Sequence, residues 1–491
     1  MALNRASTFA QTFRYVGERW PRFFCVSVVV LAPCFWHRHI AAADLGSHLY
    51  NAWLVELIQR GQAPGLWIAH QWTNVLFDYL LSGLGAAFGW WAAEKIAVSL
   101  VVLVFFWGMF ALVAAAARRA PWFLTPILAA FAYGYTFEEG FFNYYTALGL
   151  AFLGVAILWR GKGWEWLEVL ALVPLIALAH PLGLVLLLGA GAYVTIAETG
   201  PGRQALAFLA GVAALFAAHY YLWHHFAVDR NGYAAYWLNG GDQLLLFGSR
   251  YAIPECALGV FAVAALAADV IVRRRERGLW RSYAIPLELY ILVELAVPLL
   301  PTGIHITKQT AEIALLSERL TSVSAALGCC VLGAMRPRKW HLGATLAIAA
   351  VFFSFLYRDT RTINRMEAQI ERLVATLPPG QRVLATVEPL DNWRVTIQHI
   401  MDMACIGRCY SYGNYEPGSG VFRVRARPDN RIVMSNYDDA VAMENGYYTV
   451  QAEDLPAYQI YQCSASGEDL CIRPLADGED NDRLGVHPDE Q

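Results

Sequence analysis

Charged residues are scarce in this chain. Only 16% of its 491 residues are Asp, Glu, Lys or Arg, and only four of those are lysine, whereas an ordinary soluble domain is about 25% charged. Apolar residues make up 57% of the chain and its mean hydropathy is +0.38, a value that one or two anchoring segments cannot produce. The composition excludes a soluble enzyme and a disordered protein. A net charge of −3 also excludes the basic surface with which a nucleic-acid-binding protein neutralises phosphates.

The few charges are unevenly distributed. Residues 1–357 contain 24 Lys and Arg and 19 Asp and Glu, a charged fraction of about 12%, whereas residues 358–491 contain 13 Arg and 21 Asp and Glu, about 25%. The second fraction is that of an ordinary soluble domain. The composition therefore predicts a membrane domain over residues 1–357, a soluble domain over 358–475 and an acidic, disordered tail over 476–491.

Long apolar runs dominate the first part of the chain. A helix needs about 20 apolar residues to cross the hydrocarbon core of a bilayer, and eleven runs reach or approach that length. They cover residues 20–37, 92–117, 121–137, 140–159, 164–180, 181–199, 203–223, 251–272, 282–300, 312–334 and 342–357. The sequence thus predicts a mostly α fold, a polytopic membrane helix bundle of about eleven spans.

A further apolar run at residues 70–90 decides the orientation, because Lys and Arg collect in cytoplasmic loops. If this run crossed the membrane, every basic cluster from Arg118 to Lys339 would lie outside. If it lies in the outer interface, all of these clusters lie in the cytoplasm. We therefore predict a multi-pass protein of the bacterial inner (plasma) membrane, with a cytoplasmic N-terminus and an extracytoplasmic C-terminal domain.

The first apolar run has a second interpretation, as a secretory signal peptide, because Ala41-Ala42-Ala43 resembles a cleavage site. However, His37-Arg38-His39 interrupts the approach to that site, and a long basic segment precedes the run. A retained anchor is the better interpretation.

Acidic and histidine side chains collect in the predicted outer loops, the longest of which covers residues 37–91. These side chains are Asp44, His48, Glu138, Glu139 and His180. Carboxylates at the mouth of an apolar bundle are costly to keep there, so their common membrane level indicates a site. The alternative is that each of them simply contacts water at a helix end.

Two of these loops resemble a known family. The string Asp44-Leu45-Gly46-Ser47-His48-Leu49, followed by Gly61 and Pro64, is similar to the first-loop signature of the GT-C fold glycosyltransferases, and Glu138-Glu139 is similar to their second acidic loop. These are integral-membrane enzymes that take a sugar from a polyprenyl-phosphate donor. The resemblance covers residues 1–200 and, beyond them, only the hydropathy. It implies transfer of a sugar to a glycan, lipid or protein acceptor on the outer face of the membrane.

The resemblance also implies roles for individual residues. Asp44 matches the first-loop acid and is the expected general base, while Glu138 or Glu139 would orient the acceptor. A single Asp stands where some relatives carry paired acids. No cofactor is therefore certain, although Asp44 and His48 could together hold a divalent cation, Mg²⁺ or Mn²⁺.

The departing phosphate requires a basic group on the outer side. The residues expected to bind the substrate or its phosphate are His48, His180, His305, Lys308 and Arg319, with Arg250 as a further candidate. For Lys308 the alternative is a side chain that snorkels at the interface. For Arg319 the alternative is a local ion pair with Glu318.

Two other classes of function stay open. A transporter or flippase would be expected to show broken helices or an internal repeat, and the sequence shows neither. A non-catalytic membrane assembly protein of the same fold would differ from the enzyme by as little as one carboxylate, so the sequence does not separate the two.

The C-terminal part has the pattern of a small α/β domain. Helical spacing over residues 358–377 is followed by short apolar or alternating runs that Gly, Asn and Pro interrupt, which predicts a mixed sheet. Four cysteines lie there, and on the outer face they can form disulfides in three pairings or stay as buried thiols. They are Cys405, Cys409, Cys463 and Cys471.

Overall fold

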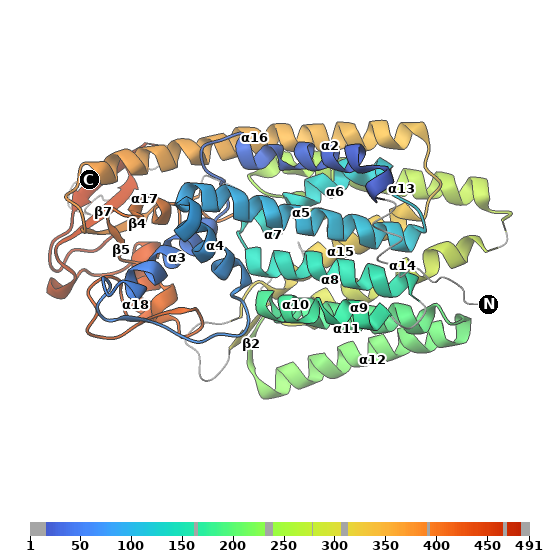
Figure 1. The fold of residues 1–491 in the computed structure, drawn as a ribbon, viewed down its shortest axis with the longest axis horizontal. Helices are drawn as coiled ribbons and strands as arrows, with labels where there is room; N and C mark the ends of the chain where they lie inside the picture. Colours follow the sequence, from blue (N-terminus) through green and yellow to red (C-terminus); the bar gives the residue numbers. More distant parts are fainter. Residues whose placement is uncertain are drawn as a thin grey trace.

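The computed structural model describes residues 16–161, 165–230, 239–276, 278–305, 313–389, 393–464 and 469–482. Figure 1 shows long helices running side by side along the longest axis, with the strands of the C-terminal region and helices α3, α17 and α18 gathered at one end. The predicted mostly α membrane bundle with a small C-terminal sheet is confirmed.

Each of the eleven predicted apolar runs is helical over most of its described residues. The helices that cover them are α2 (Trp20–Leu31) with η1 (Ala32–Phe35), α5 (Trp90–Ala117), η2 (Trp122–Leu124) with α6 (Thr125–Ala132) and α7 (Tyr135–Glu138), α8 (Phe142–Arg160), α9 (Glu165–Leu170) with α10 (Val173–Ala179), α11 (Pro181–Ala197), α12 (Pro201–His225), α13 (Ala252–Arg273), α14 (Leu279–Leu299), α15 (Leu316–Gly333) and α16 (Lys339–Ala375). Within the described chain, six helices are long and apolar enough to cross a membrane: α5, α8, α12, α13, α14 and α16. The chain is therefore an integral membrane protein.

The apolar run at 70–90 forms a short helix. This helix, α4 (Leu76–Phe88), has 13 residues, and at 1.5 Å per residue it reaches only about 20 Å, less than the hydrocarbon thickness. Its length agrees with the predicted interfacial position. Helix α3 (Leu45–Gln59) precedes it in the first outer loop and packs against it.

Helices α5 and α8 form the closest helix pair of the bundle. A Cβ added to Gly108 would lie 2.1 Å from the carbonyl oxygen of Gly149, so only glycine allows this approach. Small residues at helix crossings let membrane helices gain van der Waals contact. This crossing fixes α8, whose N-terminal end follows the Glu138-Glu139 loop.

The C-terminal region contains the predicted mixed sheet. Its strand order is β5 (Tyr410–Ser411), β4 (Arg382–Thr386), β7 (Ala457–Gln462) and β8 (Leu470–Pro474); β4 is parallel to β5 and β7, whereas β8 is antiparallel to β7. The remaining elements of this region are α17 (Asp402–Cys405), η6 (Glu416–Gly418), β6 (Val424–Ala426), α18 (Tyr437–Asn445) and η7 (Ala452–Asp454).

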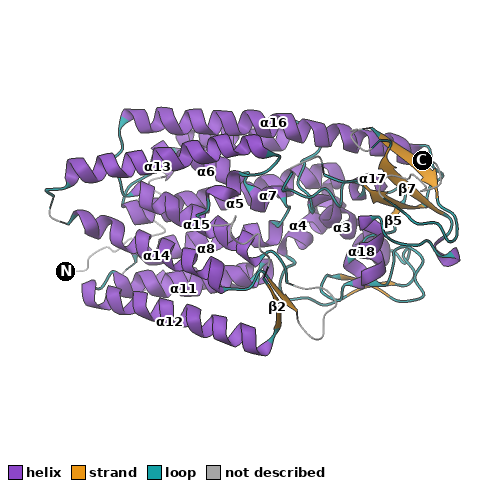
Figure 2. Ribbon diagram, turned by 180° about the vertical axis from the view of Figure 1, so that it is seen from behind, coloured by secondary structure: helices purple, strands orange, loops and turns teal. Residues whose placement is uncertain are grey.

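The chain does not break at the predicted domain boundary. Helix α16 continues through Tyr357 to Ala375 and joins the bundle to the sheet region, as Figures 1 and 2 both show. The first outer loop is also tied to the C-terminal region, because β1 (Leu66–Ile68) pairs with β6. One hydrophobic core therefore runs from the bundle into the C-terminal region.

The four C-terminal cysteines form two disulfides. Cys405 is bonded to Cys409 and Cys463 to Cys471, with Cα atoms 4.5 and 5.3 Å apart. This selects one of the three possible pairings.

The predicted tail is partly ordered. In residues 476–482, the Val450 amide donates to the Glu479 carbonyl and Asn481 is buried. The Asn481 side chain accepts a hydrogen bond from the Tyr448 amide and donates one to the Met443 carbonyl. Residues 483–491 lie outside the described residues.

Candidate functional site

Asp44 lies at the N-cap of α3, where the chain has left the first helix. Its amide donates to the Glu139 carbonyl (3.3 Å), and the neighbouring Ala43 amide donates to the Glu138 carbonyl (2.8 Å). Gly140 has a φ of +80°, and a Cβ there would lie 2.6 Å from the Asp44 nitrogen. The two predicted acidic loops are therefore in direct backbone contact. The Asp44 side chain is 32% exposed, accessible to solvent and reagents.

Only one of the two adjacent glutamates faces Asp44. The Glu139 carboxyl is buried and accepts hydrogen bonds from the amide (3.1 Å) and hydroxyl (3.2 Å) of Thr396. Burial, followed by the charge of Asp44, raises the pKa of Glu139 to about 8. Glu139 is therefore mostly neutral at pH 7, so a second negative charge beside Asp44 is largely avoided.

Glu138 points to a different place. It is buried and lines a separate pocket with Tyr133, Leu356 and Thr360, and its Oε2 has no hydrogen-bond partner among the described residues. Burial, and then the charge of Glu139, raises the pKa of Glu138 well above its usual range. Neighbouring residues on a helix point about 100° apart, which accounts for the separation.

Arg319 lies in the first turn of α15 with its guanidinium stacked on aromatic rings. Its Cζ is 4.6 Å from the ring centroid of Phe141 and 5.9 Å from that of Tyr144. Its Nε has no hydrogen-bond partner, and the described residues include no ion pair between Arg319 and Glu318. Asp44 lies close enough for its negative charge to interact electrostatically with this guanidinium. The local ion pair considered for Arg319 is thus absent from the described structure.

His180 is the N-cap of α11, and its Nδ1 accepts from the Leu182 amide at 3.2 Å. Its ring meets Tyr144 edge-on at 5.3 Å. Burial, and then the charge of Arg319, lowers the pKa of His180 to about 3. His180 is therefore a neutral imidazole, and Tyr144 contacts both its ring and the guanidinium of Arg319.

His48 is turned toward α4. Its Nδ1 lies 2.7 Å from Oδ1 of Asp78, whose Oδ2 accepts from Asn143 at 2.9 Å. Burial opposes its charge, but Asp78 outweighs burial and raises the pKa of His48 to about 9.

A charged imidazolium has no lone pair for a metal ion. The hydrogen bond to Asp78 occupies Nδ1 of His48. In the part of the chain that the structure describes, no group of three or more His, Cys, Asp or Glu is arranged to hold a metal ion. A divalent cation at Asp44 and His48 stays a prediction.

The remaining candidates lie elsewhere or are already paired. His305 is on β3 (Gly303–His305), which pairs with β2 (Ala227–Asp229), and its Nε2 contacts Asp229 at 2.6 Å. Arg250, in η5 (Ser249–Tyr251), forms an ion pair with Asp359 of α16. Lys308 lies outside the described residues.

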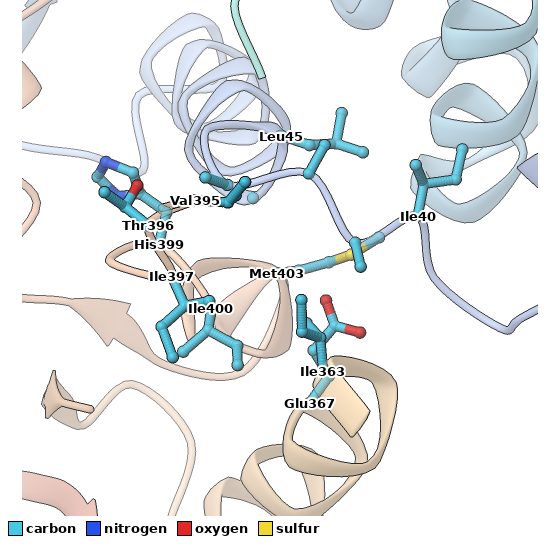
Figure 3. A pocket seen from close by; sticks show the side chains of 14 residues that line it. Ile40, Leu45, Ile363, Glu367, Val395, Thr396, Ile397, His399, Ile400 and Met403 are labelled. Atoms are coloured by element: carbon cyan, nitrogen blue, oxygen red, sulfur yellow. The ribbon is translucent and has the colours of Figure 1, made fainter. Parts of the chain in front are cut away.

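A small, partly open pocket lies behind the Asp44 loop. Figure 3 shows its lining from three segments: Ile40 and Leu45, then Ile363 and Glu367 of α16, and Val395 to Met403 of the C-terminal region. Residues 393–402 contact both predicted carboxylates, through Thr396 on Glu139 and His399 on Asp44. This segment could not be identified from the sequence, because no local motif marks Thr396 or His399.

No family model matches the chain, and no curated protein matches it in sequence. Among solved structures, the chain is similar to the crystal structure of ArnT from Cupriavidus metallidurans in the apo state, with 12% identity over 93% of this chain and 98% of that chain, and a TM-score of 0.34. At this level the likeness establishes no common function, so the functional argument rests on the residues described above.

Proposed function

We propose that the protein is a membrane glycosyltransferase that moves a sugar from a polyprenyl-phosphate donor to a hydroxyl of a glycan, lipid or protein acceptor. The proposal includes the orientation predicted from the basic loops, with the site at the outer face of a bacterial inner membrane. The observation that carries it is that an accessible carboxylate, Asp44, and a guanidinium with no ion-pair partner in the described structure, Arg319, lie at the same end of the bundle. The first-loop resemblance supports the same reaction.

Sugar transfer from a phosphate donor needs a general base and a cation that binds the departing phosphate. The acceptor oxygen forms a bond to the anomeric carbon of the donor, and the bond from that carbon to the phosphate oxygen breaks. Asp44 takes the hydroxyl proton as general base. Arg319 binds the phosphate that departs on the polyprenyl chain, because a guanidinium offers several donors to phosphate oxygens and no ion pair occupies it here.

Neutral groups around this pair would keep the two charges effective. Glu139 is mostly protonated at pH 7, and His180 is uncharged. Neither neutralises Arg319 nor adds a full negative charge beside Asp44. Tyr144 and Phe141 cover the faces of the guanidinium and shield it from water.

Native mass spectrometry of the purified full-length protein tests the proposal. We expect an adduct with the mass of a polyprenyl phosphate or its sugar conjugate. An Asp44→Asn variant should retain more of the conjugate, because binding remains and transfer is blocked. Phospholipid adducts alone, in both proteins, would contradict the proposal and favour a non-catalytic assembly protein.

The two adjacent glutamates should affect the pH profile differently. Glu139 ionises as the pH rises through about 8, which places a second negative charge next to Asp44. We expect only the form with neutral Glu139 to accept the anionic donor, so the transfer rate of the wild-type protein should fall above that pH, by about tenfold per pH unit. Glu139→Gln is neutral at every pH and should remove this fall.

Glu138→Gln is the matched control for this measurement. Because Glu138 faces a separate pocket, the variant should keep the wild-type fall in rate at alkaline pH. A profile of Glu139→Gln that still falls above pH 8, or a profile of Glu138→Gln that becomes flat, would show that the wrong glutamate has been assigned to the site.

A further inference from the structure

We propose that His399, in the C-terminal region, is a positioning residue that holds Asp44 ionised and correctly oriented. The inference rests on the proposed role of Asp44 as general base. It makes residues 393–402 a part of the site, although they follow Asp44 by some 350 positions in the sequence.

The geometry aims the imidazole at Asp44. His399 Nε2 lies 3.9 Å from Oδ1 of Asp44, and this nitrogen has no hydrogen-bond partner although the side chain is 1% exposed. An unpartnered ring nitrogen at this burial is costly unless a charge faces it. In the described structure, His399 is the one basic side chain that forms an ion pair with Asp44.

The other side of the ring is held firmly. Nδ1 lies 3.0 Å from Oδ2 of Asp402, and Oδ1 of Asp402 accepts from the Ser411 hydroxyl at 2.5 Å. Glu444 of α18 lies 3.8 Å from the same Nδ1, and the Tyr415 ring packs at 5.4 Å. Because three groups contact the ring and Ser411 holds one of them in place, the orientation of Nε2 is fixed.

The backbone around His399 is also docked on α3. A Cβ added to Gly46 would lie 2.4 Å from the His399 carbonyl oxygen. Glycine at this position lets the first turn of α3, which begins directly after Asp44, rest on the 393–402 segment. Thr396 of the same segment binds Glu139. The segment thus sets the relative positions of both carboxylates.

Several charged groups face Asp44, and His399 is the closest cation among them. His48 from α3 and Arg319 from α15 add positive charge. Glu139, directly after α7, and Glu444 from α18 add negative charge when ionised, and the phenols of Tyr135 and Tyr415 complete the surroundings. Burial opposes a charge on His399, but Glu444 and Asp402 outweigh it, so that the pKa of His399 rises to about 10. The ring stays cationic over the working pH range.

Site-resolved carbodiimide labelling tests the inference without a transfer assay. The reagent modifies carboxyl groups in their protonated form, and Asp44 is accessible to it. In full-length protein in detergent, the pH at which labelling of Asp44 is half-maximal should rise by about one unit or more in His399→Gln, because an opposite charge within about 4–6 Å shifts a carboxyl titration by 1–3 units. Labelling of Glu198, which pairs with Arg118, serves as the internal reference.

Two further variants test whether the shift comes specifically from the His399 imidazole. Asp402→Asn leaves the imidazole in place but weakens its hold, so it should move the Asp44 profile in the same direction by a smaller amount; it replaces His399→Gln if that variant fails to fold. His224→Gln is the matched control, since His224 is exposed and contacts only its own helix in the described chain. An Asp44 profile that is unchanged in folded His399→Gln overturns the inference.

The acidic limb of the transfer rate should move to higher pH by the same amount as the labelling. A shift in labelling without any transfer by the wild-type protein would overturn the proposed function and leave the His399 contact standing. Transfer with an acidic limb that His399→Gln does not move would overturn the inference and leave the proposed function standing.

Discussion

Replacing Asp44 by Asn is expected to lower the rate of sugar transfer at least a hundredfold. Asparagine keeps the size of the side chain and most of its hydrogen bonding, but it cannot accept the proton of the acceptor hydroxyl. General-base catalysis contributes about 10²–10⁴ to a rate, and no other carboxylate of the described chain combines the exposure of Asp44 with its contact to the 393–402 segment. Transfer from a defined polyprenyl-phosphate donor into reconstituted vesicles measures the effect.

The same substitution should leave the protein folded. Asp44 is the N-cap of α3 without a side-chain capping bond, and asparagine is as good an N-cap residue as aspartate. Thermal unfolding in detergent should therefore change little. Asp438→Asn, at an exposed position in the first turn of α18, is the matched control and should keep the wild-type rate. Full activity in folded Asp44→Asn would show that another group is the base.

Much of the bundle could be predicted from the sequence, because it depends on local composition. Each apolar run became a helix, and the 70–90 run became a helix too short to span. The first-loop acid and the second acidic loop were also expected at one level, and the structure joins them through the Asp44 and Ala43 amides. Hydropathy and charge patterns carry such information directly.

The contacts that complete the site could not be predicted in this way. His399 and Thr396 are separated from their partners by more than 250 residues, and no spacing rule links residues so far apart. Asp78 lies on the expected interfacial helix, yet nothing local shows that it binds His48. Tertiary packing alone brings these groups together.

The predicted boundary near residue 357 is another feature that depends on tertiary packing. Composition changes near Tyr357, and helical spacing is expected on both sides of it. The sequence did not show that the two segments form one continuous helix, α16, in which Ile363, Met366 and Ile370 are buried. A change of solvent does not by itself end a helix. The continuous helix carries Glu367 to the wall of the pocket beside Asp44.

Replacing Arg319 by Gln is expected to reduce kcat/KM for the donor on the order of 10–100-fold, since a hydrogen bond to a charged group contributes about 1.5–3 kcal/mol. Most of the loss should appear as a higher KM, because the donor phosphate is charged before transfer as well as after it. Arg319→Lys should fall between wild type and Arg319→Gln. It keeps the charge but loses the planar group that stacks on Phe141.

Arg319 has no ion-pair partner among the described residues, whereas Arg250 has one. Arg250 is bound to Asp359, so its charge is already neutralised within the protein. Arg250→Gln should destabilise the fold, because the buried Asp359 would lose its cation and keep only the hydrogen bond from the Tyr251 hydroxyl. Arg203→Gln, at an exposed position at the start of α12, removes a positive charge of no expected consequence and is the control for kinetics. If Arg319→Gln binds and turns over the donor as well as Arg203→Gln does, the phosphate is held by another cation. The opposite result, a higher KM in Arg319→Gln with an unchanged unfolding temperature, would separate phosphate binding from structure and place the donor phosphate beside Phe141 and Tyr144.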